Sequence, residues 1–297
     1  MEERKEPKVL ISQSALVKVT TMNHIVEVQH MEKMNRTNHI RKLDKDRFLD
    51  LNTGEIKEFA HIETRQDSLN SLRQTFKRLR YLINNNFVGK PNELYITFTF
   101  AKFMKDEKIF YTDFKKFMMR LKYHYKNISS IDYLSVVEPH ESGEWHCHVL
   151  MRFNDLDKVF IKHDLLSSIW SHGFIKIKAL KDVDNIGAYL SAYLSDVELN
   201  DENMIKAMVD ESEIVVKEVE GKEKKFVKGG RLHMYPPGMN IYRKSKGIVP
   251  PERIEMAFRD VKKIVGSREP HYEKSIHIEN DDFENTINYL QYNTKRK

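Results

Sequence analysis

Residues 145–151 read Trp145-His146-Cys147-His148-Val149-Leu150-Met151 and show the alternation of a β-strand. Because successive side chains on a strand point to opposite faces, residues two apart line up on the same face. His146 and His148 therefore share one face, and the odd-numbered residues, Cys147 among them, share the other. That second face has the composition of a hydrophobic core, so Cys147 is predicted to be a core residue rather than a ligand.

The segment before this strand predicts its neighbour in the sheet. Residues 131–138 have the composition of a strand, and the turn residues that follow reverse the chain into the strand of the histidines. In an antiparallel hairpin, residues directly opposite each other share a face. A register that pairs either Glu138 or Val136 with His146 places the Glu138 carboxylate beside both imidazoles, whereas a slip of one residue moves it to the other face.

Two histidines and one carboxylate on a single face form a candidate metal site. His146, His148 and Glu138 would leave positions open on an octahedral ion, where a scissile phosphate binds and is polarised. His140, in the turn, is a competing third ligand. Paired histidines on a sheet face are also compatible with a merely polar surface, so the metal site is a hypothesis.

The segments on either side of the hairpin predict further strands and helices. Strands are predicted at 94–100 and 174–178, and helices at 67–83, 112–125, 164–171 and 184–197. Asp67 and Thr112 are the predicted N-caps of the first two helices. Strands joined by turns, with helices between them, indicate an α+β fold with an antiparallel sheet.

The two ends of the chain differ from this central part. Residues 1–66 show no sustained period and predict an irregular arm with short strands. The predicted main domain covers residues 67–250 and is interrupted by an acidic insertion at about 197–223. Residues 251–297 are expected to form a C-terminal helical tail, with a helix at 254–265.

The composition indicates a folded chain with a modest excess of basic residues. Of the 297 residues, 40% are hydrophobic and 32% are charged, with a net charge of +6. The acidic insertion leaves the rest of the chain distinctly basic, which suits a polyanionic partner. No apolar run approaches the ~20 residues that a membrane span needs, and a single cysteine cannot form an internal disulfide. The sequence therefore predicts a cytoplasmic protein without a membrane partner.

Basic residues gather on the first predicted helix and in the segment 228–247. The candidates for contact with DNA phosphates are Arg73, Lys77, Arg231, Arg243, Lys244 and Lys246. A solvated charged surface explains the same pattern, so both interpretations stand.

The predicted helix at 184–197 carries Tyr189 and Tyr193, which are four residues apart and therefore on one side of the helix. A phenol that attacks a phosphodiester forms a phosphotyrosyl bond, and this bond can be reversed to rejoin the strand. Two tyrosines packed in a core explain the spacing as well. The histidines favour the catalytic interpretation, in which Tyr189 and Tyr193 are nucleophiles.

Three motifs in this order resemble those of the HUH-type replication initiators of rolling-circle plasmids and single-stranded DNA phages. Residues 95–100 resemble the first motif of that family, and residues 146–151 resemble the second, with its two histidines. Tyr189 with Tyr193 resembles the third motif in its two-tyrosine form. The resemblance spans roughly residues 67–250 and is similar to the initiators of Gram-positive hosts.

The resemblance implies a palm-like antiparallel sheet with flanking helices, Mg²⁺ or Mn²⁺ as the ion, and single-stranded or hairpin origin DNA as the substrate. It implies a site-specific endonuclease and strand transferase, which forms a 5′-phosphotyrosyl link and frees a 3′ hydroxyl for rolling-circle replication. Tyr193 is then the residue expected to open the origin. A host helicase and DNA polymerase are expected partners, because the chain has no Walker-type glycine-rich loop.

One departure from the family concerns a lysine that many relatives carry three or four positions after the tyrosine. Ala192 follows Tyr189 here, and Ser195-Asp196 follow Tyr193, so Lys176 or Lys178 is expected to supply that charge.

Two other functions explain part of the sequence. A non-catalytic, sequence-specific DNA-binding regulator accounts for the basic charge but not for the order of the motifs. A metal-dependent hydrolase would use His146, His148 and Glu138 with water and leave the tyrosines in the core.

Overall fold

The computed structural model describes residues 9–34, 39–44, 46–59, 69–104, 106–139, 144–180, 185–187, 190, 197–198, 214–219, 222–227, 234–236, 239–280 and 283–296. The chain forms two compact units, one of Met1–Ile62 with Pro251–Lys297 and one of Glu63–Pro250. Each unit has its own hydrophobic core. The second unit nearly coincides with the main domain expected at 67–250, whereas the first unit joins the two ends of the chain.

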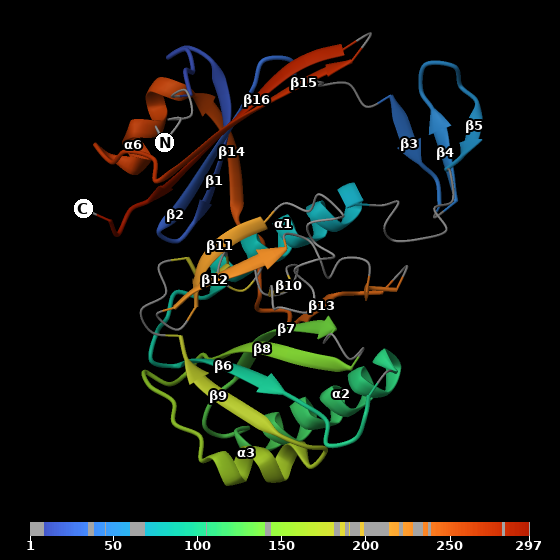
Figure 1. Ribbon diagram of the computed structural model, residues 1–297, viewed down its shortest axis with the longest axis vertical. Coiled ribbons are helices and arrows are strands. Elements are labelled where there is room, and N and C mark those ends of the chain that lie inside the picture. The colour runs from blue at the N-terminus through green and yellow to red at the C-terminus, as the bar shows by residue number, and fades with distance from the viewer. Residues whose placement is uncertain are drawn as a thin grey trace. The chain divides into compact units, whose positions relative to one another are not determined.

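Among the described residues, the second unit contains a five-stranded antiparallel sheet with the order β13-β7-β8-β6-β9. Its strands are β13 (Tyr242–Lys244), β7 (Ile131–Pro139), β8 (Trp145–Phe153), β6 (Glu93–Phe98) and β9 (Ile175–Ala179). Its helices are α1 (Leu69–Asn86), α2 (Glu107–His124) and α3 (His163–Trp170). Figure 1 shows α2 and α3 on one side of the sheet and α1 on the other. The α+β class with an antiparallel sheet is thus confirmed.

The side of the sheet toward α2 and α3, here called the α2 face, is built from large apolar side chains. Phe98, the last residue of β6, packs edge-on against Phe114 and Phe117 of α2, with ring centroids 6.0 and 4.7 Å apart. It also packs against Trp170 of α3, at 5.0 Å. Such aromatic pairs contribute about 0.5–1.5 kcal/mol each beyond the burial of their area. This cluster explains why the apolar stripes of α2 and α3 turn toward the sheet.

The start of α2 differs from the sequence prediction. Asp106, and not Thr112, caps the helix, because its carboxylate accepts hydrogen bonds from the backbone N–H groups of Lys108 and Ile109, at 2.8 and 3.3 Å. Thr112 lies inside the helix, where its hydroxyl donates to the Lys108 carbonyl at 2.9 Å. A carboxylate is also stabilised by the helix dipole at this end, which explains the earlier start. The other predicted cap, Asp67, lies outside the described residues.

The acidic insertion expected at 197–223 contributes strands to a small sheet. In the described part of this segment, β10 (Val197–Glu198) pairs with β12 (Lys222–Val227), which pairs with β11 (Ile214–Val219). The preceding helix, predicted at 184–197, is helical at Ile186, Gly187 and Leu190, while Val197 is already part of β10.

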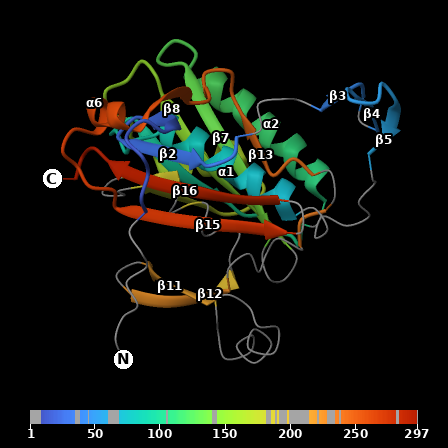
Figure 2. The ribbon, with the colours of Figure 1, turned by 90° about the horizontal axis from the view of Figure 1, so that it is seen from above.

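The first unit corrects the expectation for both ends of the chain. Where the sequence predicts an irregular arm at 1–66 and a helical tail at 251–297, the described residues form a sheet with the order β14-β1-β2-β16-β15. Its strands are β14 (Glu252–Ala257), β1 (Leu16–Met22), β2 (Ile25–Met31), β16 (Phe283–Asn293) and β15 (Tyr272–Asn280). Figure 2 shows β15 and β16 side by side. The arm was predicted as irregular because the partners of its strands lie more than two hundred residues away, where local periodicity carries no information.

The helix predicted at 254–265 is correct only in its second half. β14 takes its first residues, and η3 (Phe258–Val261) and α6 (Lys262–Val265) follow. Val261 and Val265 are buried against the valines of β1 and β2. A smaller sheet of β3 (Ile40–Lys42), β4 (Arg47–Asp50) and β5 (Ile56–Glu58) completes the described part of this unit.

A search of the described helices for a segment long and apolar enough to cross a membrane finds none.

Candidate active site

The strands β7, β8 and β6 bring the predicted histidines and carboxylate onto the same face of the sheet. Glu138 pairs directly with His146, and Val136 pairs with His148, which is the first of the two registers that favour a shared site. Thr97 of β6 lies opposite His148 on the other side. The face that carries these residues is here called the histidine face.

His148 is held from both sides of its ring. The hydroxyl of Tyr95 lies 2.6 Å from His148 Nδ1, and Thr97 Oγ1 lies 3.2 Å from the same nitrogen. The other ring nitrogen, Nε2, is hydrogen-bonded to Glu138 Oε2. The rings of Tyr95 and His148 are parallel within 3°, with centroids 5.6 Å apart. These contacts determine the orientation of the imidazole on the sheet.

Burial keeps His148 in its neutral form. The side chains of His148 and Glu138 are 16% and 10% exposed, and loss of solvent lowers the pKa of His148 to about 4. A neutral imidazole has one donor and one acceptor nitrogen. With Glu138 as a carboxylate, Nε2 carries the proton and donates it to Glu138, while Nδ1 accepts a hydrogen bond from the Tyr95 hydroxyl. The donor and acceptor roles of this set are thus mutually satisfied.

The ligands proposed for a metal are close together but do not enclose an ion in this arrangement. Within the described residues, no group of three His, Cys, Asp or Glu side chains is placed to hold one. Glu138 and His148 contact each other through Oε2 and Nε2, which are the atoms that would bind. His146 is half-buried on the same face. The donor set of two imidazoles and one carboxylate fits a divalent ion, provided that the ion replaces the proton shared by Glu138 and His148.

Cys147 lies on the α2 face, as predicted, and not with the histidines. It is fully buried, opposite Val137 on one side and Phe98 on the other. Burial raises the pKa of the Cys147 thiol well above its usual range. A protonated thiol in an apolar environment is a poor metal ligand, so Cys147 belongs to the core.

The start of the tyrosine segment packs against α1 and reaches the histidine face. Asn84 of α1 donates to Asn185 Oδ1 at 2.9 Å and accepts from the backbone N–H of Gly187 at 2.8 Å. A Cβ at Gly187 would lie 2.7 Å from the Arg80 carbonyl oxygen, so this close approach requires glycine. Three residues later, Leu190 lines a cavity of about 10 Å³ together with Tyr95 and His148.

Several predicted site residues cannot be placed. Tyr189, Tyr193 and His140 lie outside the described residues, and so does Arg231. The side chain of Arg73 is likewise not described, although its backbone is part of α1.

The lysines expected to replace the family's conserved charge lie on the histidine face. Lys176 of β9 pairs with Thr97, which in turn pairs with His148. Lys178 pairs with Tyr95 in the same way. Lys176 is exposed and Lys178 is half-buried. Both therefore lie two strands from β8, on the side where Tyr95 and Thr97 contact His148.

The described DNA-binding candidates are spread over different surfaces and not gathered at His148. The Lys77 ammonium lies 5.5 Å from the ring centre of Tyr81 on α1. Arg243 turns toward α2, where its guanidinium stacks 3.5 Å from the ring centre of Tyr111. Lys244 and Lys246 line an open groove at the far end of β7.

Tyr95 and Thr97 are site residues that the sequence reasoning did not assign. Both belong to the strand that was predicted at 94–100, and the signal was present there. On that strand the residues facing the core are Leu94, Ile96 and Phe98, so the alternating polar residues had to face the other way.

The residues of this site fall within one stretch that is similar to a known family. Residues 93–198 match the family model of the replication-associated proteins of the ORF2 type. The matched stretch begins with β6 and ends with β10, so it includes Tyr95, Glu138, both histidines and the tyrosine segment. This similarity supports a role in DNA replication, with DNA as the partner. No curated protein and no solved structure matches the chain.

Proposed function

We propose that this protein is a replication initiator that nicks single-stranded origin DNA by tyrosine transesterification. The observation that carries the proposal is the common location of Glu138, His146 and His148 on a buried polar face that Leu190 of the tyrosine segment also reaches. The match of residues 93–198 to a replication-associated family supports the same role.

The reaction exchanges one phosphodiester for another. The phenol oxygen of Tyr193 or Tyr189 attacks the scissile phosphorus and loses its proton, and the bond from phosphorus to the 3′ oxygen breaks. The departing 3′ oxygen gains a proton and becomes the free 3′ hydroxyl, while the 5′ phosphate remains on the tyrosine. No water is consumed, so the second tyrosine or the same 3′ hydroxyl can reverse the link.

His146, His148 and Glu138 would hold a divalent cation, Mg²⁺ or Mn²⁺, on the histidine face. When bound, such an ion polarises a phosphoryl oxygen as a Lewis acid. Tyr95 and Thr97 support this role, because a hydrogen bond to the distal ring nitrogen orients a metal-binding histidine.

The protein's own residues contribute orientation and charge. Thr97 and Tyr95 hold the His148 ring, and Asn84 and Gly187 hold the start of the tyrosine segment against α1. Lys176, exposed on the same face, supplies a positive charge for the phosphate of the bound strand.

The experiment that tests the proposal detects the covalent intermediate. The full chain is incubated with Mn²⁺ and single-stranded oligonucleotides from the neighbouring replicon, and the products are separated on a denaturing gel. We expect a protein band shifted by the 5′ fragment, which Tyr193→Phe abolishes and Tyr189→Phe retains. Each change removes one hydroxyl and leaves the ring, so DNA affinity serves as the control.

The same experiment separates the alternatives. A double variant that still forms the adduct would exclude these tyrosines. Cleavage without any adduct would identify a metal-dependent hydrolase, and binding without cleavage would identify a non-catalytic DNA-binding regulator.

A further inference from the structure

An open groove of about 890 Å³ lies at the end of the sheet where β7 begins. One wall is the C-terminal end of α2 with the loop that follows, and the other is β13 with the turn after it. Four exposed lysines line the groove, two from each wall: Lys122, Lys126, Lys244 and Lys246. Since Asp132 lies six residues before Glu138 on the same strand, the groove is roughly 20 Å from the histidines.

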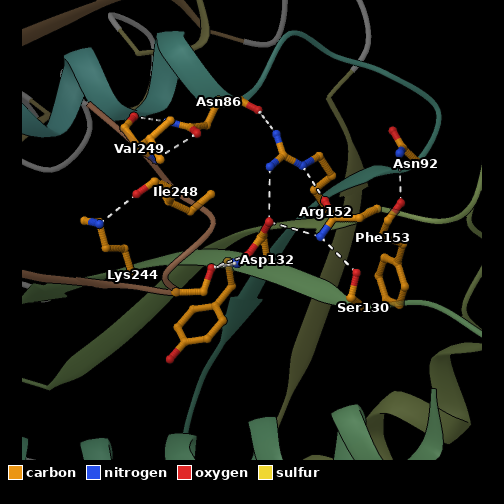
Figure 3. A network of polar contacts seen from close by, with 12 residues as sticks. Asn86, Asn92, Ser130, Asp132, Arg152, Phe153, Lys244, Ile248 and Val249 are labelled. Carbon is orange, nitrogen blue, oxygen red and sulfur yellow. Dashed lines mark hydrogen bonds and ion pairs between the residues drawn. The ribbon is translucent and has the colours of Figure 1, made fainter. Parts of the chain in front are cut away.

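The positive charge of this groove is not cancelled from within. Asp132 accepts hydrogen bonds from Ser245, at 2.8 Å, and from Arg152, at 3.2 Å, so its carboxylate is already paired with a cation (Figure 3). These contacts outweigh its partial burial and lower the pKa of Asp132. Asp155 is engaged by the backbone N–H and the hydroxyl of Ser130, at 2.7 and 2.9 Å.

The lysines themselves point to an anionic partner. In the part of the chain that the structure describes, none of the four forms an ion pair with a carboxylate. Lys122 lies over the ring of Tyr133 at 5.6 Å and Lys126 over the ring of Tyr123 at 4.5 Å, while Lys244 donates to the Ile248 carbonyl at 2.7 Å.

The turn that carries two of these lysines is built into the sheet. Ser245 donates its backbone N–H to the Tyr133 carbonyl at 2.9 Å and accepts the Tyr133 N–H on its hydroxyl at 3.0 Å. A Cβ at Gly247 would lie 2.2 Å from the Asp132 carboxylate, so only glycine lets the turn approach this closely. Lys244 and Lys246 are thus presented by a fixed loop.

Apolar surface accompanies the charge. Ile128 is 52% exposed in the groove, and the ring of Tyr133 also lines it. A lysine-rich groove with an aromatic side chain and exposed apolar surface is suited to a nucleic acid strand whose bases are unpaired, because phosphates contact the lysines while bases pack on the apolar groups.

We infer that this lysine groove is a second DNA-binding site, which holds the sugar-phosphate backbone of a single-stranded segment away from the histidines. The identity of the strand as DNA rests on the proposed function. The groove acts in binding and not in the chemical step.

The test compares two triple variants that change the net charge equally. Lys122→Gln, Lys126→Gln and Lys246→Gln remove charge from the groove, whereas Lys108→Gln, Lys115→Gln and Lys158→Gln remove it from exposed positions that do not line it. Binding of a labelled single-stranded oligonucleotide to the full chain is measured by fluorescence anisotropy in EDTA, between about 50 and 200 mM KCl.

We expect the groove triple to bind at least ~10-fold more weakly and to lower the slope of log affinity against log salt by about 2, since each phosphate contact on a single strand contributes about 0.7. The control triple should keep the wild-type slope. A Lys→Arg version of the groove triple should restore it, which excludes a folding defect.

Equal slopes for the groove and control triples would overturn the inference. An equal loss of affinity for duplex DNA of the same sequence would overturn the assignment to a single strand. Adduct formation is measured separately in Mn²⁺: a wild type that never forms the adduct but shows different slopes for the two triples would refute the nicking function and leave the groove in place.

Discussion

The two faces of β8 carry alternate residues of the same strand and serve different purposes. On the α2 face, Cys147 is fully buried and its neighbour Phe98 packs among aromatic rings of α2 and α3. On the histidine face, His148 is nearly as buried, but its neighbours are the polar groups of Tyr95, Thr97 and Glu138. A buried polar group requires partners, whereas a buried apolar group requires only close packing. The α2 face should therefore determine stability, and the histidine face should determine chemistry.

The largest expected effect lies on the α2 face. Phe98→Ala removes a side chain with no solvent exposure from the aromatic cluster and leaves a cavity. We expect a loss of about 3–5 kcal/mol in the free energy of unfolding, measured by urea denaturation. The adjacent change Thr97→Val, on the histidine face, is the matched control and should cost about 1 kcal/mol or less. Similar losses for the two variants would remove the distinction between the faces.

The next effect concerns the rate of nicking. His146→Ala and His148→Ala should each slow adduct formation at least ~10²-fold, or about 2.7 kcal/mol, because each removes an imidazole that would bind the metal. Affinity for single-stranded DNA in EDTA should not change. His148→Ala should also lower the free energy of unfolding by about 1–3 kcal/mol, since Glu138 loses its partner. Normal cleavage by either variant would show that the proposed metal site is wrong.

The histidine face should also make stability depend on pH. The pKa of His148 is about 4 in the folded chain and near 6.5 when burial is lost, so below pH 6.5 the unfolded chain binds a proton that the folded chain does not. Stability is then complete above about pH 7 and falls as the pH drops toward 4. Between pH 7.5 and 5 this one group should cost roughly 2 kcal/mol.

Denaturation of the wild type and of His148→Gln at both pH values measures this contribution. We expect a smaller loss of stability on acidification in the variant. Cys147 should contribute nothing in this range, because burial raises the pKa of its thiol. An identical pH dependence of the two proteins would contradict the neutral state assigned to His148.

The smallest effect sharpens the role of Tyr95. Tyr95→Phe removes the hydroxyl that lies 2.6 Å from His148 Nδ1 and keeps the ring beside the imidazole. We expect a loss of about 0.5–1.5 kcal/mol in stability and a higher Mn²⁺ concentration for half-maximal nicking, roughly 10-fold or more. If the Mn²⁺ requirement is unchanged, Tyr95 supports the fold but does not position a metal ligand.

The sequence by itself determined which residues of each strand share a face. The alternation in 145–151 separates His146 and His148 from Cys147, and the same alternation in 94–98 places Tyr95 and Thr97 opposite Phe98. This inference succeeds because the two-residue period of a strand is a local property of the backbone. The helical stripes of α2 and α3 were predicted for the same reason, although Asp106 and not Thr112 begins α2.

Only the tertiary structure decided what depends on contacts between distant segments. The pairing of Glu138 with His146 was one of two registers compatible with a shared site, and the hydrogen bonds of His148 to Tyr95 and Thr97 follow from the placement of β6 beside β8. The sheet that joins β1 and β2 to β14 and β16 was not visible in the sequence. Its strands are stabilised by partners at the opposite end of the chain, and a local pattern cannot reveal which distant strand completes a sheet.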